Sequence, residues 1–130
     1  MNAQELFDYA VGIAGISANN AQNYLTTYIH QLNATLAETF KLENNNRLFK
    51  AVAVLDAIPY LTALTDIIPY QDNIVRNVLP YGILTHLQLS DDDVIKTGYY
   101  QSRYIDNARI ESKMIEQDIE DVYGVSDDDA

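Results

Sequence analysis

Two histidines, His30 and His86, are the residues of this chain best suited to acid–base chemistry or metal binding near neutral pH. Each stands alone, outside any HExxH pattern, and the sequence of 130 residues contains no cysteine. A zinc site, a disulfide or a nucleophilic cysteine therefore has no basis in the sequence. We predict that both histidines are structural or surface residues and that the chain binds no cofactor.

Consecutive aspartates occur twice, as Asp91-Asp92-Asp93 and as Asp127-Asp128-Asp129. An EF-hand loop instead places oxygen ligands at alternate positions, with a glycine inside the loop and a glutamate at its end. The first run is predicted to cap a helix and the second to be a solvated tail. Any two of the 19 acidic residues could in principle form a glycosidase pair, but no cluster of polar groups accompanies one.

Phosphate-binding loops, the dinucleotide-binding glycine motif and the nucleophile elbow are all missing from the sequence. We therefore predict that the chain is not an enzyme. No stretch approaches the roughly 18 to 20 uninterrupted apolar residues that a membrane span needs, so no membrane partner is predicted.

Charge is the most unusual property of the composition. The chain has 19 acidic and 8 basic residues, a net charge of −11, and 12 of the acidic residues lie from position 90 onwards. Such a chain binds nucleic acid poorly, because phosphate contacts need lysine and arginine. The acids either form an ordinary solvated surface or line a passage through which DNA must move without being held.

Apolar spacing predicts a mainly α protein. Helices are expected over Ala3 to Ala14 and over Asn20 to Lys41, and the run Glu43-Asn44-Asn45-Asn46 is expected to end the second helix. Residues 47–71 are predicted to be mostly extended, with up to two short strands, because Pro59 and Pro69 force extended backbone before them.

The second half is predicted to hold two further helices. Asp72-Asn73 caps the first, in which Pro80 marks either a kink or a new helix start. Ser90 and three aspartates are expected to begin a helix over Asp91 to Tyr123, about 45 Å long at 1.5 Å per residue. Together these elements predict one domain, 1–124, built as a small bundle of about four helices with a long C-terminal helix and an extended central loop. An acidic tail, 125–130, follows it.

Ten tyrosines accompany only three phenylalanines and no tryptophan. Tyrosine buries a ring while its hydroxyl stays hydrogen-bonded or wet, which suits surfaces that are buried only on assembly. Two interpretations stay open, semi-buried core aromatics and anchors of a subunit interface. The candidate interface residues are Tyr60, Tyr70, Tyr81, Tyr99, Tyr100 and Tyr104.

Several short motifs between roughly Leu61 and Ile110 occur in a suggestive order: Thr65-Asp66 before an extended turn, Leu79-Pro80-Tyr81-Gly82, and Asp91 to Tyr104 at an acidic helix start. This pattern resembles the head–tail adaptor, or head-completion and connector, proteins of tailed bacteriophages. The resemblance implies a mostly helical subunit of a closed ring of twelve copies. One face of that ring would dock on the portal protein, and the other would receive the stopper or tail.

The resemblance also assigns roles and a location. The protein would belong to the neck of the virion, would be made in the host cytoplasm, and would let DNA pass without specific binding. The C-terminal end of the long helix would contact the portal through Ile115, Ile119, Val122, Tyr123 and Val125. Acids expected to face the channel are Glu111, Glu116, Asp118, Glu120 and Asp121.

The charge alone supports a second interpretation from another class. A small acidic regulator, such as a DNA mimic or an antitoxin, would occupy the nucleic-acid site of a basic protein partner. This alternative explains the net charge but leaves the extended middle segment and the tyrosines without a role.

Overall fold

The computed structural model describes the backbone of residues 1–123 and the side chains of residues 1–112. It is mainly helical, as the apolar spacing predicted. The elements are α1 (Ala3–Ala14), α2 (Ala18–Ala21), the 3-10 helix η1 (Gln22–Tyr24), α3 (Leu25–Phe49), α4 (Asp72–Asn77), α5 (Leu79–Ser90) and α6 (Val94–Tyr123).

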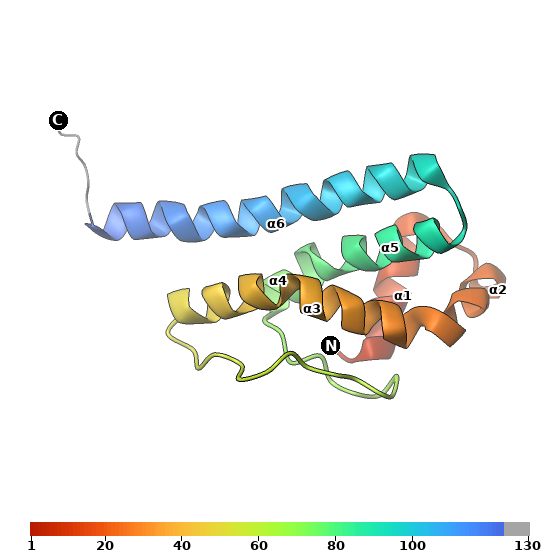
Figure 1. Ribbon diagram of the computed structural model, residues 1–130, viewed down its shortest axis with the longest axis horizontal. Helices are drawn as coiled ribbons and strands as arrows, with labels where there is room; N and C mark the ends of the chain where they lie inside the picture. The colour runs from red at the N-terminus through yellow and green to blue at the C-terminus, as the bar shows by residue number, and fades with distance from the viewer. Residues whose placement is uncertain (124–130) are drawn as a thin grey trace.

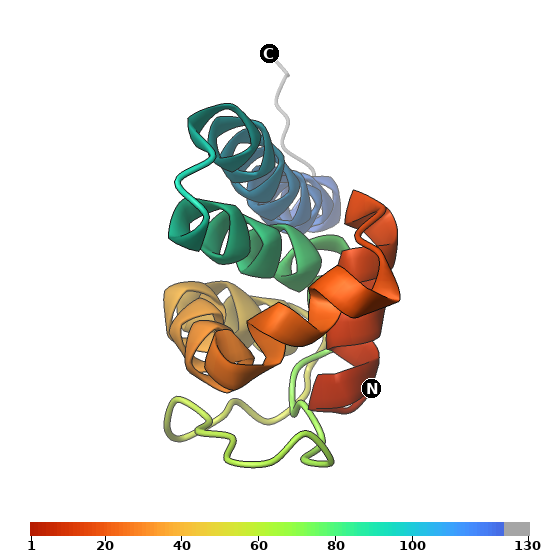
Figure 2. The ribbon, with the colours of Figure 1, turned by 90° about the vertical axis from the view of Figure 1, so that its right-hand side faces the viewer.

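Helix α5 is the centre of the bundle and packs against α1, α3, α4 and α6. Figure 2 shows the elements stacked in the order α6, α5, α3 and the segment 50–71, with α1 running across one side. The arrangement follows from burial, because seven of the twelve α5 residues are buried on several sides of the helix. They are Leu79, Pro80, Gly82, Ile83, Leu84, Leu87 and Gln88.

Gly82 sets how closely three helices approach. A Cβ atom at this position would lie 2.7 Å from Cγ2 of Thr35 on α3 and 2.8 Å from the ring of Tyr104 on α6. Only a residue without a side chain fits between these two neighbours, so α3, α5 and α6 meet in one tight layer.

Helix α1 has the bounds that the sequence predicted. Asn2 and Glu5 form a reciprocal capping box, with 2.8 Å for each of the two hydrogen bonds. The helix ends at Gly15, whose φ of 68° is the left-handed conformation that glycine adopts without strain.

The predicted end of the second helix was wrong. Helix α3 continues through Glu43, Asn44 and Asn46 to Phe49, and it begins at Leu25 after two short helical segments. The three polar side chains do not compete with the helix, because each binds a segment distant in the sequence. Tertiary hydrogen bonds thus override the local preference of asparagine for turns.

The extended middle segment is confirmed, but the predicted short strands were wrong within residues 1–123. The chain between α3 and α4 is irregular, and Asn2 and Ile67 form an isolated antiparallel bridge. Figure 1 shows this segment running along α3 on the side away from α6.

Pro80 begins a new helix rather than kinking an old one. Helix α4 ends at Asn77, and Pro80 lies in the first turn of α5, where its missing N–H costs no hydrogen bond. Ser90 was predicted to cap the last helix, but it is the final residue of α5, and its hydroxyl donates to the Leu87 carbonyl at 2.7 Å. Asp93 caps α6 instead, accepting from the Lys96 N–H at 3.0 Å.

Candidate assembly surfaces

The six tyrosines predicted for a subunit interface have different surroundings. Tyr60 and Tyr99 are well exposed, at 72% and 56%. Tyr70 is buried, and its hydroxyl donates to the Leu36 carbonyl, so it is a core residue and offers no area to another chain. The assignment of Tyr70 to an interface is therefore corrected, because its ring fills the space between the loop and α3.

The remaining three tyrosines are half-buried along α5 and α6. The Tyr104 hydroxyl donates to Glu38 Oε1 at 2.8 Å, and burial together with this bond raises the pKa of Tyr104. Tyr81 lies under the guanidinium of Arg103, 5.0 Å from the ring centre, and Tyr100 contacts Tyr99 edge to face. These three stabilise the packing of α6 and are only partly exposed.

Two asparagines on α3 hold the backbone of the extended segment. Asn33 accepts from the Leu61 N–H at 2.8 Å and donates to the Leu61 carbonyl at 2.9 Å. Asn44 does the same for Leu55, at 2.9 and 3.1 Å. Each amide group therefore pairs with both the N–H and the carbonyl of one residue, as a neighbouring β-strand would.

The later part of the extended segment is held as well. The first amides of α1 donate to loop carbonyls, from Ala3 to Asp66 at 3.0 Å and from Gln4 to Leu64 at 2.9 Å. Asp66 accepts from the Thr62 and Ala63 N–H groups, and these bonds lower the pKa of its carboxyl. Because the backbone is anchored at so many points, the side chains of this segment are held in fixed positions on the surface.

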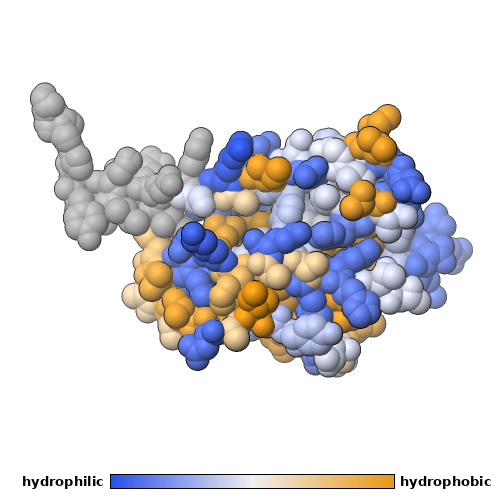
Figure 3. Space-filling model, viewed as in Figure 1, coloured by the Kyte–Doolittle hydropathy of each residue, from blue (hydrophilic) through white to orange (hydrophobic). Residues whose placement is uncertain are grey.

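Many of those side chains are apolar and exposed, and the last two residues of α3 continue the same surface. We call this set the loop patch; it comprises Leu48, Phe49, Val52, Val54, Ile58, Tyr60 and Ile67. Figure 3 shows apolar side chains gathered near the end of the molecule where α3 finishes. A rigid backbone that presents apolar groups to solvent is typical of a docking surface.

A second exposed apolar set lies at the turn between α5 and α6. We call it the turn patch; it comprises Leu89, Val94, Ile95 and Tyr99, and Val94 and Ile95 are 82% and 86% exposed. In Figure 1 this turn lies at the opposite end of the long axis from the C-terminal end of α3. Figure 2 shows the segment 50–71 on the α3 side of the stack and this turn on the α6 side, so the two patches lie on different sides of the molecule.

Helix α6 lies along α5 and also contacts α3 and α4. Its last turns reach past the ends of those helices in Figure 1, as expected for a rod of this length. The predicted portal residues Ile115, Ile119, Val122, Tyr123 and Val125 lie outside the residues whose side chains the structure describes. The same holds for the predicted channel acids Glu116, Asp118, Glu120 and Asp121.

Glu111 is the one predicted channel acid within the described side chains, and its carboxylate is occupied. It accepts from Asn73 at 2.7 Å and from Asn77 at 3.3 Å, and Asn107 one turn earlier donates to the Asn77 carbonyl at 2.7 Å. Glu111 thus fastens α6 to α4 in this structure and does not stand free toward solvent.

The two histidines lie on different helices, His30 on α3 and His86 on α5. His30 is exposed, and His86 lies 3.4 Å from Glu38 Oε1 on the flank of α5. Within the described residues no three His, Cys, Asp or Glu side chains gather as a metal site would require. In the same part of the chain no helix is both long and apolar enough to span a membrane.

Sequence reasoning missed the residues that shape these surfaces. Asn33 and Asn44 stand eleven residues apart, three turns along one face of the helix, and that spacing signals side chains directed at a common neighbour. Val94 and Ile95 are two adjacent apolar residues directly after an acidic turn. At the start of an ordinary amphipathic helix at least one of two such neighbours would be polar, so the pair signals an exposed apolar surface. Both signals were present in the sequence.

Comparison with protein-family models, with curated proteins and with solved structures finds no match to this chain. The resemblance to head–tail adaptors therefore depends on the sequence motifs alone.

Proposed function

We propose that this chain is the subunit of a ring-forming head–tail adaptor of a tailed bacteriophage. The ring would dock under the portal protein, extend the DNA channel and offer the attachment site for the stopper or tail. The observation that supports this proposal is the pair of exposed apolar patches on different sides of the molecule.

Closed rings need two different surfaces on each subunit, because each copy contacts one neighbour on either side. A two-fold dimer would instead need one surface that matches itself. The loop patch and the turn patch differ in composition and lie on different sides of the molecule, so joining one to the other between neighbouring copies would bury both. Tyr60 and Tyr99, the two most exposed of the predicted interface tyrosines, belong one to each patch.

The remaining roles follow from the shape and the charge. The projecting end of α6 is suited to reach the portal, and its removal should abolish portal binding without changing the circular dichroism of the body. Twelve copies would carry a net charge of about −130, given −11 for each chain. Because screening acts over about 8 Å at physiological salt, acids on the channel wall would repel DNA from that wall.

Oligomer mass tests the ring directly. The double variant Tyr60→Ser with Ile95→Ser removes one large apolar group from each patch and should convert the ring to monomer in light scattering. The variant Ile13→Ser is the matched control, because Ile13 is also exposed but lies on α1 outside both patches. A chain that is monomeric before mutation at all concentrations, also in the presence of the portal protein, would refute the proposal.

A small acidic regulator remains the second candidate, and the net charge of −11 favours it. A DNA mimic or an antitoxin would bind a basic nuclease or repressor as a monomer or dimer, in competition with nucleic acid. Negative-stain imaging of the purified chain separates the two candidates, because only the adaptor forms rings.

A further inference from the structure

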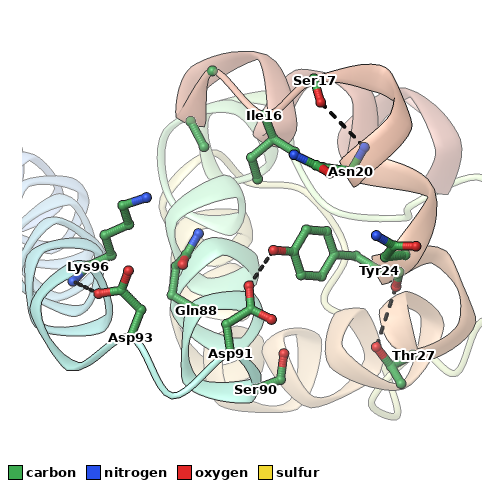
Figure 4. A pocket seen from close by; sticks show the side chains of 13 residues that line it. Ile16, Ser17, Asn20, Tyr24, Thr27, Gln88, Ser90, Asp91, Asp93 and Lys96 are labelled. Carbon is green, nitrogen blue, oxygen red and sulfur yellow. Dashed lines mark hydrogen bonds between the residues drawn. The ribbon is translucent and has the colours of Figure 1, made fainter.

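A polar hollow of about 670 Å³ lies between the α1–α2 link, η1 and the turn from α5 to α6. Figure 4 shows the side chains that surround it, which come from residues 14–27 and from residues 88–96. Oxygen- and nitrogen-bearing groups dominate its lining, among them Asn20, Tyr24, Gln88, Asp91, Asp93 and Lys96. No residue of the loop patch or the turn patch lines this hollow, although the turn patch lies on the same α5–α6 turn.

Gln88 is the buried group that this hollow leaves without a partner. The residue is only 5% exposed, and its carbonyl accepts from the Asp91 and Asp93 N–H groups at 3.2 and 3.1 Å. No hydrogen bond joins its side-chain amide to any residue in 1–112. Figure 4 shows Gln88 at the wall of the hollow, beside Asp91 and across from Tyr24. Gln31 Oε1 is the one fully enclosed side-chain polar atom without a partner in residues 1–112, so the Gln88 amide is not sealed off but opens onto the hollow, where it is free to hydrogen-bond a ligand.

Two carboxylates beside Gln88 each keep one oxygen free. Asp91 Oδ2 accepts from the Tyr24 hydroxyl and Asp93 Oδ1 from the Lys96 N–H, whereas Asp91 Oδ1 and Asp93 Oδ2 have no partner among residues 1–112. Lys96 offsets one of the two charges, and the C-terminal end of α5 adds partial negative charge at the same turn. The hollow is therefore suited to a cation with several donors.

The same chain shows what a side-chain amide does with extended backbone. Asn33 and Asn44 each bind the N–H and the carbonyl of one residue in the segment 50–71. Gln88 carries the same chemical group with both functions free. We propose that the hollow binds an extended peptide segment of a partner protein, with Gln88 on a peptide unit and an arginine of that segment on Asp91 and Asp93.

Arginine fits better than other cations because its planar group carries five donors and binds two carboxylate oxygens at once. This proposal does not depend on ring formation, since the hollow is complete within one chain. It therefore applies equally to a monomeric protein and to a ring subunit.

Titration of the ¹⁵N-labelled full chain with N-acetyl-arginine N-methylamide tests the proposal by NMR. This probe carries one arginine side chain and two peptide units. Saturable shifts are expected for the Gln88 side-chain amide and for the Asp91 to Asp93 backbone, with a dissociation constant in the millimolar range. N-acetyl-glutamine N-methylamide, which keeps the peptide units but lacks the charge, should bind at least about tenfold more weakly.

Variants locate the site. Gln88→Leu and Asp91→Asn should each weaken binding about tenfold. Asp93→Asn should also weaken it, because asparagine keeps the helix cap but removes the charge. Asp92→Asn is the matched control: it makes the same charge change, Asp92 does not line the hollow, and asparagine tolerates its φ of 57°. Circular dichroism checks that each variant is folded.

Three results would overturn the proposal. The first is no saturable shift at Gln88 up to 100 mM probe, a concentration about a hundredfold above a millimolar constant. Equal binding of the glutamine probe would show a general polar site with no arginine recognition. Equal weakening by Asp92→Asn and Asp91→Asn would show that the net charge of the turn, and not the hollow, attracts the probe.

Discussion

Glu43 and Arg47 form an ion pair one turn apart on α3, with 2.7 Å between Oε2 and Nε, and the Glu43 side chain is completely buried. Glu43 also accepts from the Gln71 N–H at 3.0 and 3.1 Å. Arg47 donates to the carbonyls of Ala53 and Pro69. This one pair therefore fastens both the beginning and the end of the extended segment to α3.

Replacing Glu43 by leucine should release the extended segment from α3 and destabilise the protein. The change leaves the Arg47 guanidinium without its carboxylate and the Gln71 N–H without an acceptor, so the free energy of unfolding should fall by about 3–5 kcal/mol. Urea denaturation followed by circular dichroism measures it. Asn45→Leu is the control, because Asn45 is exposed two residues along the same helix. A loss below about 1 kcal/mol would mean that the pair contributes no anchoring.

The run Glu43 to Asn46 also shows where sequence reasoning reaches its limit. Asparagines usually favour turns, and nothing within the run reveals that Asn44 binds Leu55 or that Asn46 binds Gln71 and Asn73. The partners are 11 to 27 residues away along the chain, and only the folded arrangement brings them together. By contrast, the bounds of α1 were predictable, because its capping box and terminal glycine are local signals.

Asn33→Ala should loosen the middle of the extended segment. The substitution leaves the N–H and the carbonyl of Leu61 without their partner, at a cost of about 1–3 kcal/mol of unfolding free energy. Hydrogen exchange of the Leu61 amide should accelerate at the same time, since its acceptor is lost. Asn45→Ala, an exposed asparagine of the same helix, should change neither quantity appreciably. Unchanged exchange at Leu61 would contradict the anchoring role of Asn33.

Two helical glycines, Gly82 in the core and Gly98 on the surface, make a matched pair. At Gly82 an added Cβ would lie 2.7 Å from Thr35 and 2.8 Å from Tyr104, whereas at Gly98 it meets nothing within 4 Å. Gly82→Ala should therefore destabilise the protein by about 1–3 kcal/mol through overpacking. Gly98→Ala should stabilise it by about 0.5–1 kcal/mol, because alanine is the better helix former. Thermal unfolding of the two variants measures both signs, and a stabilising Gly82→Ala would disprove the tight layer.

Exposure of the tyrosines was not predictable from composition, although their number was informative. Tyr60 and Tyr70 lie in the same extended segment, and each directly follows a proline. Yet Tyr60 is 72% exposed, whereas Tyr70 is buried against α3. The difference depends on which side of an irregular backbone each ring leaves, and no periodicity fixes that side. Helical residues were easier to place, since apolar spacing determines the buried face.

The bond between Tyr24 and Asp91 should appear as a pH effect. The carboxylate of Asp91, with a smaller effect of burial, raises the pKa of Tyr24 to about 12, from about 10 in an unfolded chain. A raised folded pKa favours the protonated form in the folded state. The stability that Tyr24 contributes is therefore fully present below pH 10 and is lost as the pH rises through about 12.

Titration of ¹³C-labelled tyrosine by NMR resolves Tyr24 from the other nine, with Tyr24→Phe to assign its signal. Asp91→Asn should return the pKa of Tyr24 toward 10, because the amide carries no charge to oppose the phenolate. Asp92→Asn should leave it unchanged, since Asp92 lies in the same turn without contacting Tyr24. The stability difference between the wild type and Tyr24→Phe in urea should shrink between pH 10 and pH 12. A wild-type Tyr24 that titrates near 10 would show that the hydrogen bond to Asp91 is absent in solution.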